Sequence, residues 1–313
     1  VRILPGTPFD WLNNLESPPM RALFIGNSYI DISFATPALP LNDTKIRGAS
    51  YALSLGGNSV VAGICAKRLG AEVEFLVPRA ADELGFLSAE LYAREGVITH
   101  TRPTVRSSLA IIIPNGSKRA IMLADEQNYL APAPAIDLKR YTHLHFDGHM
   151  PEVTLQLAQA ARQQGVLTSL DAGTMRQNTL EVLPFMDYVV ASQHFCEQLG
   201  KSPADALTYL VGLGVKVAAV TLGAEGCLVY EGGQHHLVPA IPVAKVVDSA
   251  GAGDTFHGAY MYSLMAHPAR RFVQHCEFAR VVSALQIQKL GTVAALPTAA
   301  EVQALLVQYP VSA

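Results

Sequence analysis

The sequence lacks long apolar runs and any excess of positive charge. No apolar run reaches the roughly 18 residues that a membrane-spanning helix needs, and the first residues do not show the pattern of a signal peptide. The formal net charge of −3 at pH 7 and the absence of a basic run argue against a nucleic-acid partner. We therefore expect a cytoplasmic protein with neither a membrane nor a nucleic acid as partner.

Cysteine is also scarce, and several catalytic signatures are missing. The four cysteines form no C-x-x-C pair, so the chain suits a reducing compartment, with each thiol in the core, better than a disulfide framework. No G-x-x-x-x-G-K-[ST], no G-x-G-x-x-G after a strand and no G-x-S-x-G occurs, which argues against P-loop, dinucleotide-binding and serine-hydrolase classes. The cysteines are Cys65, Cys196, Cys227 and Cys276.

What is present is ample apolar sequence. The chain has 313 residues, 50% hydrophobic and 16% charged, which predicts a globular protein with a sizeable core. Residues 1–19 differ, because they are polar, contain the only tryptophan, Trp11, and precede Met20, which resembles a natural start. We interpret 1–19 as an extension outside the fold, natural or left by cloning, and 20–313 as one domain.

From Met20 onward, short apolar runs alternate with longer stretches of helical periodicity. Strands that alternate with helices predict an α/β fold with a mostly parallel sheet covered on both faces. Ligands of such sheets bind at the carboxyl ends of the strands. The expected strands are 22–26, 73–77, 143–146, 167–170, 188–191 and 216–222, and the expected helices are 59–69, 83–95, 152–164, 203–213 and 254–265.

Two segments, at about 33–55 and 99–124, lack helical periodicity and interrupt this alternation. In the second, apolar runs at 107–113 and 119–123 flank Asn115-Gly116, a pair typical of a β-hairpin turn. Together the segments predict a small β-sheet that projects from the main domain. Such a sheet suits a lid over the strand ends, or a surface for pairing with a second subunit.

The stretch from Asp248 to Gly258 carries the strongest chemical signal. Gly251-Ala252-Gly253 is a flexible turn directly before Asp254 and a helical run. Glycines let backbone N–H groups point into one space, and a helix N-terminus favours an anion there. A carboxylate beside a phosphate suits a base that takes a proton from an attacking hydroxyl. The alternative is an ordinary glycine turn with Asp254 in the first helical turn.

Several motifs follow one another in a recognisable order along nearly the whole chain, from about Met20 to Pro297. In this order the chain resembles the ribokinase-like, PfkB-type family of carbohydrate kinases, and residues 145–149 and the segment at Ser192 are more similar to its ketohexokinase and sulfofructose kinase branch than to ribokinase itself. The resemblance implies a three-layer α/β/α sandwich with a β lid. The motifs are Gly26-Asn-Ser-Tyr-Ile-Asp31, Gly56-Gly57-Asn58, Arg68-Leu-Gly70, Thr221-Leu-Gly-Ala-Glu-Gly226 and Gly251-Ala-Gly-Asp254.

The resemblance also implies roles for individual residues. Asp254 would be the catalytic base, and Gly251, Ala252 and Gly253 would form the anion hole for the transferred phosphoryl group. For the nucleotide loop the alternative is a glycine turn between two strands, and for His257, one helical turn after Asp254, it is a surface or core histidine. The residues expected to contact ATP are Thr221, Gly223, Gly226, Ser192 and His257.

Asp31, expected at the end of the first strand, can accept hydrogen bonds from two hydroxyls of a sugar; a helix-cap or turn aspartate is the alternative. Gly56, Gly57 and Asn58 would let backbone and an amide approach the same sugar, unless they are only a Gly-Gly turn and a helix cap. Relatives often carry a further Asn three residues on. This chain has Val61 there, so one expected hydroxyl contact is missing.

Arg119, on the expected hairpin, resembles a basic lid residue that reaches the transferring phosphate in some relatives. An arginine there would stabilise charge in the transition state or bind an anionic group of the substrate. Arg106 on the neighbouring strand is the competing candidate, and a solvated hairpin charge is the alternative for Arg119.

A rival constellation is formed by His143, His145, Asp147 and His149. Its spacing comes within one residue of the H-x-H-x-D-H pattern of binuclear metallohydrolases, which makes a zinc-dependent hydrolase an alternative. On a parallel strand buried on both faces, however, histidines also pack against helices. Because Asp147 and His149 would fall at the carboxyl end of this strand, we expect them in the sugar pocket.

No residue is assigned with certainty to a metal. Mg²⁺ is needed to offset the triphosphate charge, and we expect ATP and water to hold most of it, near Asp171 at the end of the next strand. A loop-capping aspartate is the alternative for Asp171. Asp248 stands where some relatives border a loop for a monovalent cation such as K⁺, with a turn aspartate as the alternative.

The sequence therefore predicts an ATP-dependent sugar kinase that transfers the γ-phosphoryl group to a hydroxyl, most simply a primary one, of a sugar or sugar derivative. A nucleoside kinase of the same fold is the alternative. It would need a base-stacking pocket, and the lid segments supply few aromatics, chiefly Phe34 and Tyr51. The expected partners are the sugar, ATP and a second copy of the chain bound through the β lid.

Overall fold

The computed structural model describes residues 21–36, 43, 45–115 and 118–312, so the expected extension at 1–19 lies outside the described residues. Its large sheet has the strand order β13-β12-β11-β10-β9-β8-β1-β4-β5 over these ranges. Neighbours from β11 to β5 are parallel, whereas β12 near one edge pairs antiparallel with both β11 and β13. The strands are β1 (Arg21–Ile25), β4 (Glu72–Arg79), β5 (Ile98–Pro103), β8 (His143–Phe146), β9 (Leu167–Ala172), β10 (Tyr188–Ser192), β11 (Val217–Thr221), β12 (Cys227–Glu231) and β13 (Gln234–Val238).

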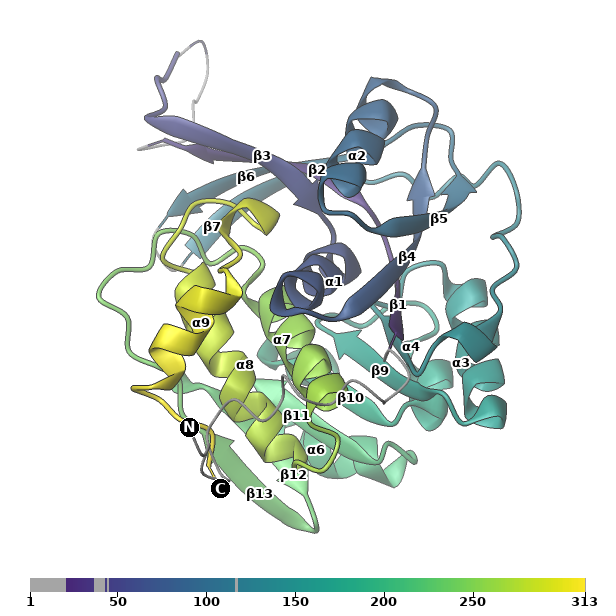
Figure 1. The fold of residues 1–313 in the computed structure, drawn as a ribbon, viewed down its shortest axis with the longest axis vertical. Helices are drawn as coiled ribbons and strands as arrows, with labels where there is room; N and C mark the ends of the chain where they lie inside the picture. Colours follow the sequence, from purple (N-terminus) through teal and green to yellow (C-terminus); the bar gives the residue numbers. More distant parts are fainter. Residues whose placement is uncertain (1–20, 37–42, 44, 116–117, 313) are drawn as a thin grey trace, which may run out of the picture.

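Helices cover both faces of this sheet, as expected for buried parallel strands (Figure 1). Leu23 and Phe24 of β1 point to opposite faces; Phe24 joins a core cluster with α1, α7 and α8, and Leu23 joins one with α3 and α6. The predicted three-layer α/β/α sandwich is confirmed. The helices are α1 (Asn58–Leu69), α2 (Glu83–Arg94), α3 (Pro151–Gln164), α4 (Thr179–Val182), α5 (Gln193–Gln198), α6 (Pro203–Gly212), α7 (Ala252–Ala266), α8 (Phe272–Gln286) and α9 (Ala299–Leu306).

A second, smaller sheet projects from one end of the sandwich, at the upper left of Figure 1. Its order is β3-β2-β6-β7, with β2 antiparallel to β3, β2 parallel to β6, and β6 and β7 joined as the expected hairpin. We call these four strands the lid. They are β2 (Tyr29–Ala35), β3 (Ser50–Gly56), β6 (Ser108–Asn115) and β7 (Lys118–Ala124).

The lid differs from the expectation in two places. The first strand ends at Ile25, and Asp31 lies inside β2 of the lid rather than at the end of the first strand. The segment from Ile98 to Pro103 pairs with β4 in the large sheet, so the expected lid boundary at about 99 is too early. Both errors have one cause. The sequence of an extended segment does not predict which sheet it joins, because its partner strands are distant in sequence.

Two close approaches bring the helices that begin near the lid together. Gly57, with φ of 102°, precedes α1, and a Cβ there would lie 2.3 Å from the carbonyl oxygen of Asn27. Gly258 of α7 lies against α1, where a Cβ would lie 2.1 Å from the carbonyl oxygen of Ala62. The starts of α1 and α7 are thereby held side by side. None of the helices in the described ranges is long and apolar enough to cross a membrane.

Candidate active site

The turn before α7 has the geometry of an anion site. Gly251 caps the helix with φ of 77°, a conformation that favours glycine, and leaves the first N–H groups of α7 without helical partners. Asp254 lies in the first turn, partly buried, and its carboxylate accepts no hydrogen bond from the described residues. Burial and the nearby Asp171 carboxylate together raise the pKa of Asp254 to about 7, against the opposing charges of His257 and Arg119. A base with free lone pairs and a pKa near neutrality can accept a proton at this position.

Asp171 lies near Asp254, and both oxygens of its carboxylate accept hydrogen bonds. Its carboxylate accepts hydrogen bonds from the Asn58 side chain at 2.9 Å and the Gly173 N–H at 2.8 Å, and it lies 3.4 Å from Nε2 of His257. Burial alone would raise the pKa of Asp171, but His257 and Asn58 hold it well below its usual value. His257 in turn lies 3.2 Å from the Tyr260 hydroxyl. Asp171 therefore stays ionised and influences Asp254 through its charge.

Asp31 faces the same region from the lid. It is buried, and Oδ2 accepts a hydrogen bond from the hydroxyl of Thr292 at 2.8 Å. A Cβ at Gly56 would lie 2.0 Å from Oδ1 of Asp31, so only glycine fits opposite this carboxylate. Burial raises the pKa of Asp31 to about 6, against the hydrogen bond from Thr292. Nothing in the sequence singles out Thr292, which comes from a loop some 260 residues away.

Asn58 and Val61 lie on the first turn of α1. The Asn58 amide donates to Asp171, which ties the start of α1 to the end of β9. Val61, where relatives carry an Asn, is completely buried in the core cluster between α1 and α7. Apolar packing thus takes the place of the missing polar contact.

The structure shows contacts of Asp147 that the sequence does not predict. The carboxylate is buried and accepts hydrogen bonds from the backbone N–H groups of Asn27, Ser59 and His149, and from Nδ1 of His149. Burial opposes ionisation, but His149 and Arg176 lower the pKa of Asp147 below its usual value. Asp147 therefore clamps the ends of β1 and β8 to the start of α1.

We expect Asp147→Asn to lower the free energy of unfolding at pH 7 by about 3 kcal/mol, because an amide faces N–H donors that lose their ionised acceptor. Urea unfolding measures this. Because the folded-state pKa of Asp147 is lowered, the stabilisation is present above the pKa of an unfolded aspartate and is lost as pH falls through the folded pKa. The exposed Asp137, which accepts one backbone N–H, is the matched control, and Asp137→Asn should cost less than about 1 kcal/mol. Equal losses in the two variants would contradict the clamp.

The four residues of the rival zinc constellation do not converge. His143 pairs with Thr142, and His145 pairs with Ser169, while Asp147 and His149 bind each other. Burial lowers the pKa of His145 to about 3, so it is a neutral core residue. Within the described part of the chain, no three His, Cys, Asp or Glu side chains are placed to hold a metal ion. The zinc alternative has no structural support.

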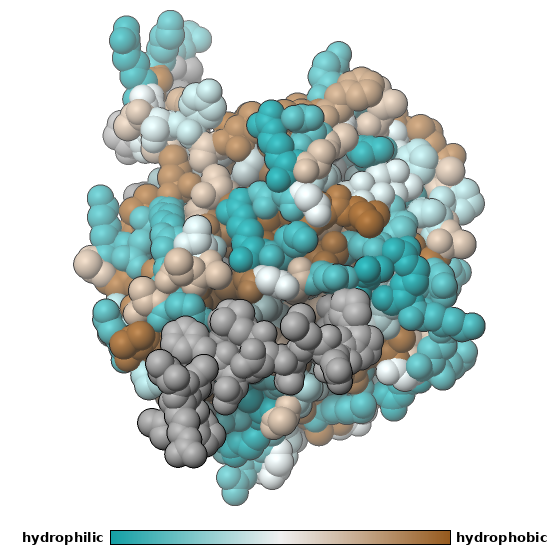
Figure 2. Space-filling model, in the orientation of Figure 1, coloured by the Kyte–Doolittle hydropathy of each residue, from teal (hydrophilic) through white to brown (hydrophobic). Residues whose placement is uncertain are grey.

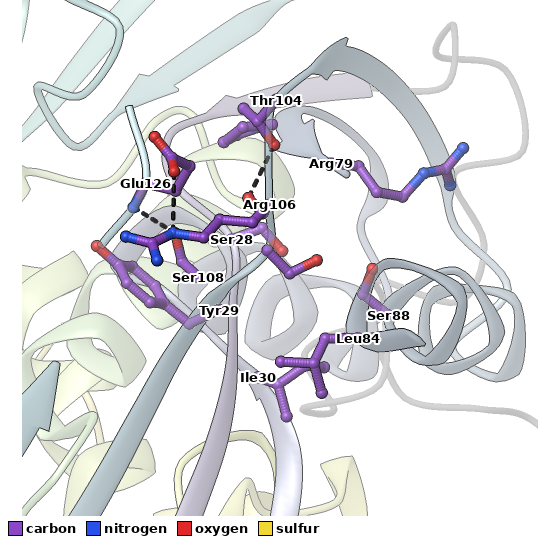
Figure 3. A pocket seen from close by; sticks show the side chains of 12 residues that line it. Ser28, Tyr29, Ile30, Arg79, Leu84, Ser88, Thr104, Arg106, Ser108 and Glu126 are labelled. Atoms are coloured by element: carbon purple, nitrogen blue, oxygen red, sulfur yellow. Dashed lines mark hydrogen bonds and ion pairs between the residues drawn. The ribbon is translucent and has the colours of Figure 1, made fainter. Parts of the chain in front are cut away.

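Arg119 and Arg106, the two competing lid arginines, have different surroundings. Nη1 of Arg119 lies 3.3 Å from the Ser249 hydroxyl, next to the turn that precedes α7. Arg106 instead pairs with Glu126 at 3.0 Å, in a small pocket at the root of the lid (Figure 3). Ile30 lines that pocket, and its neighbour Asp31 points to the opposite face of β2. Arg119 is therefore the arginine that reaches the candidate site.

The expected nucleotide residues lie at the carboxyl ends of β10 and β11. Thr221 ends β11, and the turn that follows closes with a hydrogen bond from the Leu222 N–H to the Gly226 carbonyl at 2.8 Å. Gly226 has φ of 107°, and a Cβ there would lie 2.1 Å from the carbonyl oxygen of Val238. Ser192 caps α5 and donates to the carbonyl of Gly173, so its hydroxyl is committed to structure. Gly223 lies at the surface of this turn.

Asp248, the expected neighbour of a monovalent cation, is completely buried. One oxygen accepts the Ala250 N–H at 2.9 Å, and the other accepts the Gly291 N–H at 3.0 Å. In this structure the residue joins the turn before α7 to the loop that carries Thr292.

Fold and site together define a phosphotransferase with an alcohol group as acceptor. The chain belongs to the pfkB family of carbohydrate kinases, whose model matches residues 21–299. It is 27% identical over 297 residues to the ribokinase of Lactococcus lactis, covering 92% of this chain and 97% of that protein. It superimposes on ribokinase from Giardia lamblia with a TM-score of 0.80 at 17% identity, covering 93% of this chain and 100% of that one. For Arabidopsis thaliana ribokinase complexed with ribose and ATP, the TM-score is 0.79 at 23% identity, covering 93% and 99%. These relatives are ribokinases, and the ketohexokinase and sulfofructose kinase branch stays a prediction.

Proposed function

We propose that this protein transfers the γ-phosphoryl group of ATP to a hydroxyl, most simply a primary one, of a sugar or sugar derivative. One observation carries the proposal: Asp254, with no hydrogen-bond donor among the described residues and a pKa raised to about 7, lies beside the N–H groups of Gly251 and Gly253, which have no acceptor among those residues. A base and an anion site at one helix start are what phosphoryl transfer to a hydroxyl requires. The relative with a bound sugar and ATP supports the choice of ligands.

The residues divide the reaction between them. Asp31, held by Thr292, would accept hydrogen bonds from sugar hydroxyls and direct one of them toward Asp254. Asp254 would take the proton as the hydroxyl oxygen attacks the phosphorus in line. The N–H groups of residues 251–253 would take up the charge of the transferring group, and Arg119 would approach it from the lid. The lid would exclude water that otherwise hydrolyses ATP.

The nucleotide would lie over the carboxyl ends of β10 and β11, with its triphosphate directed to the turn before α7. A Cβ at Gly223 would meet no heavy atom within 4 Å, so its backbone leaves room for a phosphate chain. Asp171 does not fit as a direct Mg²⁺ ligand, because Asn58, Gly173 and His257 already occupy its oxygens. We therefore propose that ATP and water hold Mg²⁺, which neutralises phosphate charge when bound. The proposal includes no K⁺, because the residues around Asp248 satisfy one another.

The lid supports a sugar acceptor over a nucleoside. Phe34 and Tyr51 pair across β2 and β3, and Phe34 is three residues from Asp31, so both aromatic rings lie on the face opposite the site. The inner face carries Ala110 and Ile112, which pack against Ala250. Neither can stack on a base as an aromatic ring does.

An acceptor screen tests the proposed function. Purified protein with ATP and Mg²⁺ is offered aldoses, ketoses, sugar acids and nucleosides, and ADP release is measured for each. We expect acceptor-dependent ADP release with at least one sugar or sugar derivative and a phosphorylated product by mass spectrometry. Release with nucleosides alone would favour the nucleoside kinase, and no acceptor-dependent release would overturn the proposal.

The pH dependence should follow Asp254. Because a base must be deprotonated, kcat/KM for the acceptor should fall as pH falls through about 7, the pKa of Asp254. Asp171→Asn removes the neighbouring negative charge, lowers the pKa of Asp254 and should move this acid limb to lower pH. The acid limb should persist in His257→Gln, because this variant removes the imidazole and keeps the Asp254 carboxylate. The variant therefore distinguishes titration of Asp254 from titration of His257. A limb that vanishes in His257→Gln, or stays in place in Asp171→Asn, would contradict the assignment.

We further propose that a second copy of the chain covers the outer face of the lid. Paired residues Phe34 and Tyr51, and also Leu53 and Met122, lie on that face and leave 36%, 69%, 40% and 54% of their surface exposed. In Figure 2 apolar residues, coloured brown, lie along the lid where it leaves the main body. An apolar face of this kind marks an interface. Sedimentation velocity should show a dimer that Leu53→Lys converts to monomer, whereas a monomeric wild type would overturn this.

A further inference from the structure

Gln286, the last residue of α8, is completely buried yet uses only half of its amide. Its Nε2 donates to the carbonyl of Ala250 at 2.7 Å and to the carbonyl of Gly291 at 3.1 Å. Its Oε1 has no hydrogen-bond partner among the described residues. The two acceptors of Nε2 assign the amide in this orientation, because the flipped amide would place oxygen against two carbonyl oxygens. Burying an amide oxygen without a hydrogen-bond donor costs free energy of folding. The two hydrogen bonds of Nε2 must therefore offset this cost.

Gln286 shares its two partner residues with Asp248. Asp248 accepts the N–H groups of Ala250 and Gly291, and Gln286 donates to the carbonyls of the same two residues. Both peptide polar groups of each residue are thereby satisfied by one pair of side chains. Asp248 and Gln286 form a clamp between two loops that meet beside the site.

Each loop positions one half of the reaction. Ala250 precedes Gly251, the cap of α7 and start of the anion turn. Gly291 precedes Thr292, which donates to Asp31 and to the carbonyl of Leu55. A Cβ on Gly251 would come within 3.4 Å of Thr292, so the two loops also touch. A shift of either loop would separate the proposed anion hole from the carboxylate of Asp31.

The clamp does not fit a monovalent cation at Asp248. Such cations are held by carboxylate and carbonyl oxygens. Here two carbonyl oxygens accept the amide of Gln286, and the carboxylate accepts N–H groups whose partial positive charge would face the ion. The partly positive Nε2 supplies the link between carbonyls that an ion would otherwise supply.

We infer that Gln286 is a positioning residue that holds the anion turn against the Thr292 loop in the place of a monovalent cation. The inference rests on the proposed function for its kinetic consequence, but its structural part concerns the clamp alone.

Salt exchange on the wild type tests the inference without any variant. Thermal unfolding and acceptor-dependent ADP release are measured at equal ionic strength in chlorides of K⁺, Na⁺ and tetramethylammonium, which is too large for a cage of carbonyls. We expect unfolding midpoints within 1 °C of each other and rates within about twofold, the size of a general salt effect. An increase of fivefold or more in rate, or of several degrees in midpoint, with K⁺ over tetramethylammonium would overturn the inference. If no acceptor is phosphorylated in any salt, the proposed function fails, and the unfolding midpoints still decide on the clamp.

Gln286→Ala tests the positioning role. We expect kcat to fall and the acceptor KM to rise, with kcat/KM down at least tenfold, while the KM for ATP stays within about twofold, because the loop at Gly226 is not part of the clamp. The exposed Gln288, which donates to the carbonyl of Ala284 one turn earlier, is the matched control, and Gln288→Ala should keep normal kinetics. A folded Gln286→Ala protein with unchanged kcat and acceptor KM would overturn the inference.

Discussion

Asp254→Asn is expected to lower kcat for sugar phosphorylation about a thousandfold, within the range for removal of a general base. The amide keeps the shape of the side chain and the start of α7, but it cannot take the proton of the attacking hydroxyl. ATP should bind as well as before or more tightly, because a negative charge facing the phosphates is removed. Single-turnover product formation and equilibrium nucleotide titration separate the two effects.

The folded state of this variant supplies an internal check. The pKa of Asp254 is raised on folding, so its carboxylate disfavours folding increasingly as pH rises from the unfolded pKa through about 7. At pH 8 the Asn variant should therefore unfold at the same or a higher temperature than the wild type. Asp205→Asn is the matched control, because Asp205 also lies in the first turn of a helix, α6, but outside the site. Near-normal turnover in Asp254→Asn would sink the assignment of the base.

Asp31→Asn is expected to lower kcat/KM for the acceptor at least a hundredfold. The carboxylate has one oxygen bound by Thr292 and the other available to sugar hydroxyls, and an amide in its place turns one acceptor into a donor. Sites built to hydrogen-bond a hydroxyl lose large factors when a partner is mismatched. The loss should appear mainly in the acceptor KM, whereas the KM for ATP stays unchanged. Steady-state kinetics with each substrate varied in turn measures both.

Ser33 provides the control for this experiment. It lies two residues along β2 on the same face as Asp31, is also buried, and its hydroxyl has no partner in the described part of the chain. Ser33→Ala should leave the acceptor KM within about twofold. If both variants lose the same factor, the effect belongs to the lid strand as a whole, and Asp31 has no special role in binding.

Local sequence was informative wherever the needed partners are neighbours in the chain. The helix periods and apolar runs predicted six strands and five helices of the sandwich within one or two residues, but they did not predict α8, α9 or the strands β12 and β13 at one edge. The start of α7 was equally readable, because Gly251 and Asp254 are only three residues apart. The lid hairpin was predicted from two apolar runs that flank Asn115-Gly116, and its strands β6 and β7 pair antiparallel.

Where the partner is distant, sequence reasoning erred or was silent. Asp147 was predicted to bind sugar, but its motif gave no sign that the carboxylate also accepts the N–H groups of Asn27 and Ser59, which belong to two distant segments. Thr292 and Gln286 carry no motif and matter only through tertiary contacts, of Thr292 with Asp31 and of Gln286 with Ala250. Arg119 and Arg106 could not be ranked until the fold paired Arg106 with Glu126 and brought Arg119 to Ser249.

The sequence by itself determined the class of this protein: an α/β sandwich with a lid, a glycine turn and a carboxylate at a helix start, all set by short-range backbone preferences and by periodicity. Only the tertiary structure decided which polar groups remain free for chemistry. The carboxylate of Asp147 is surrounded by donors, so its oxygens are engaged in structural hydrogen bonds. The carboxylate of Asp254 is buried beside Asp171 without a donor, which raises its pKa into the range of a base. Those environments depend on contacts between residues far apart in the chain, which no local pattern encodes.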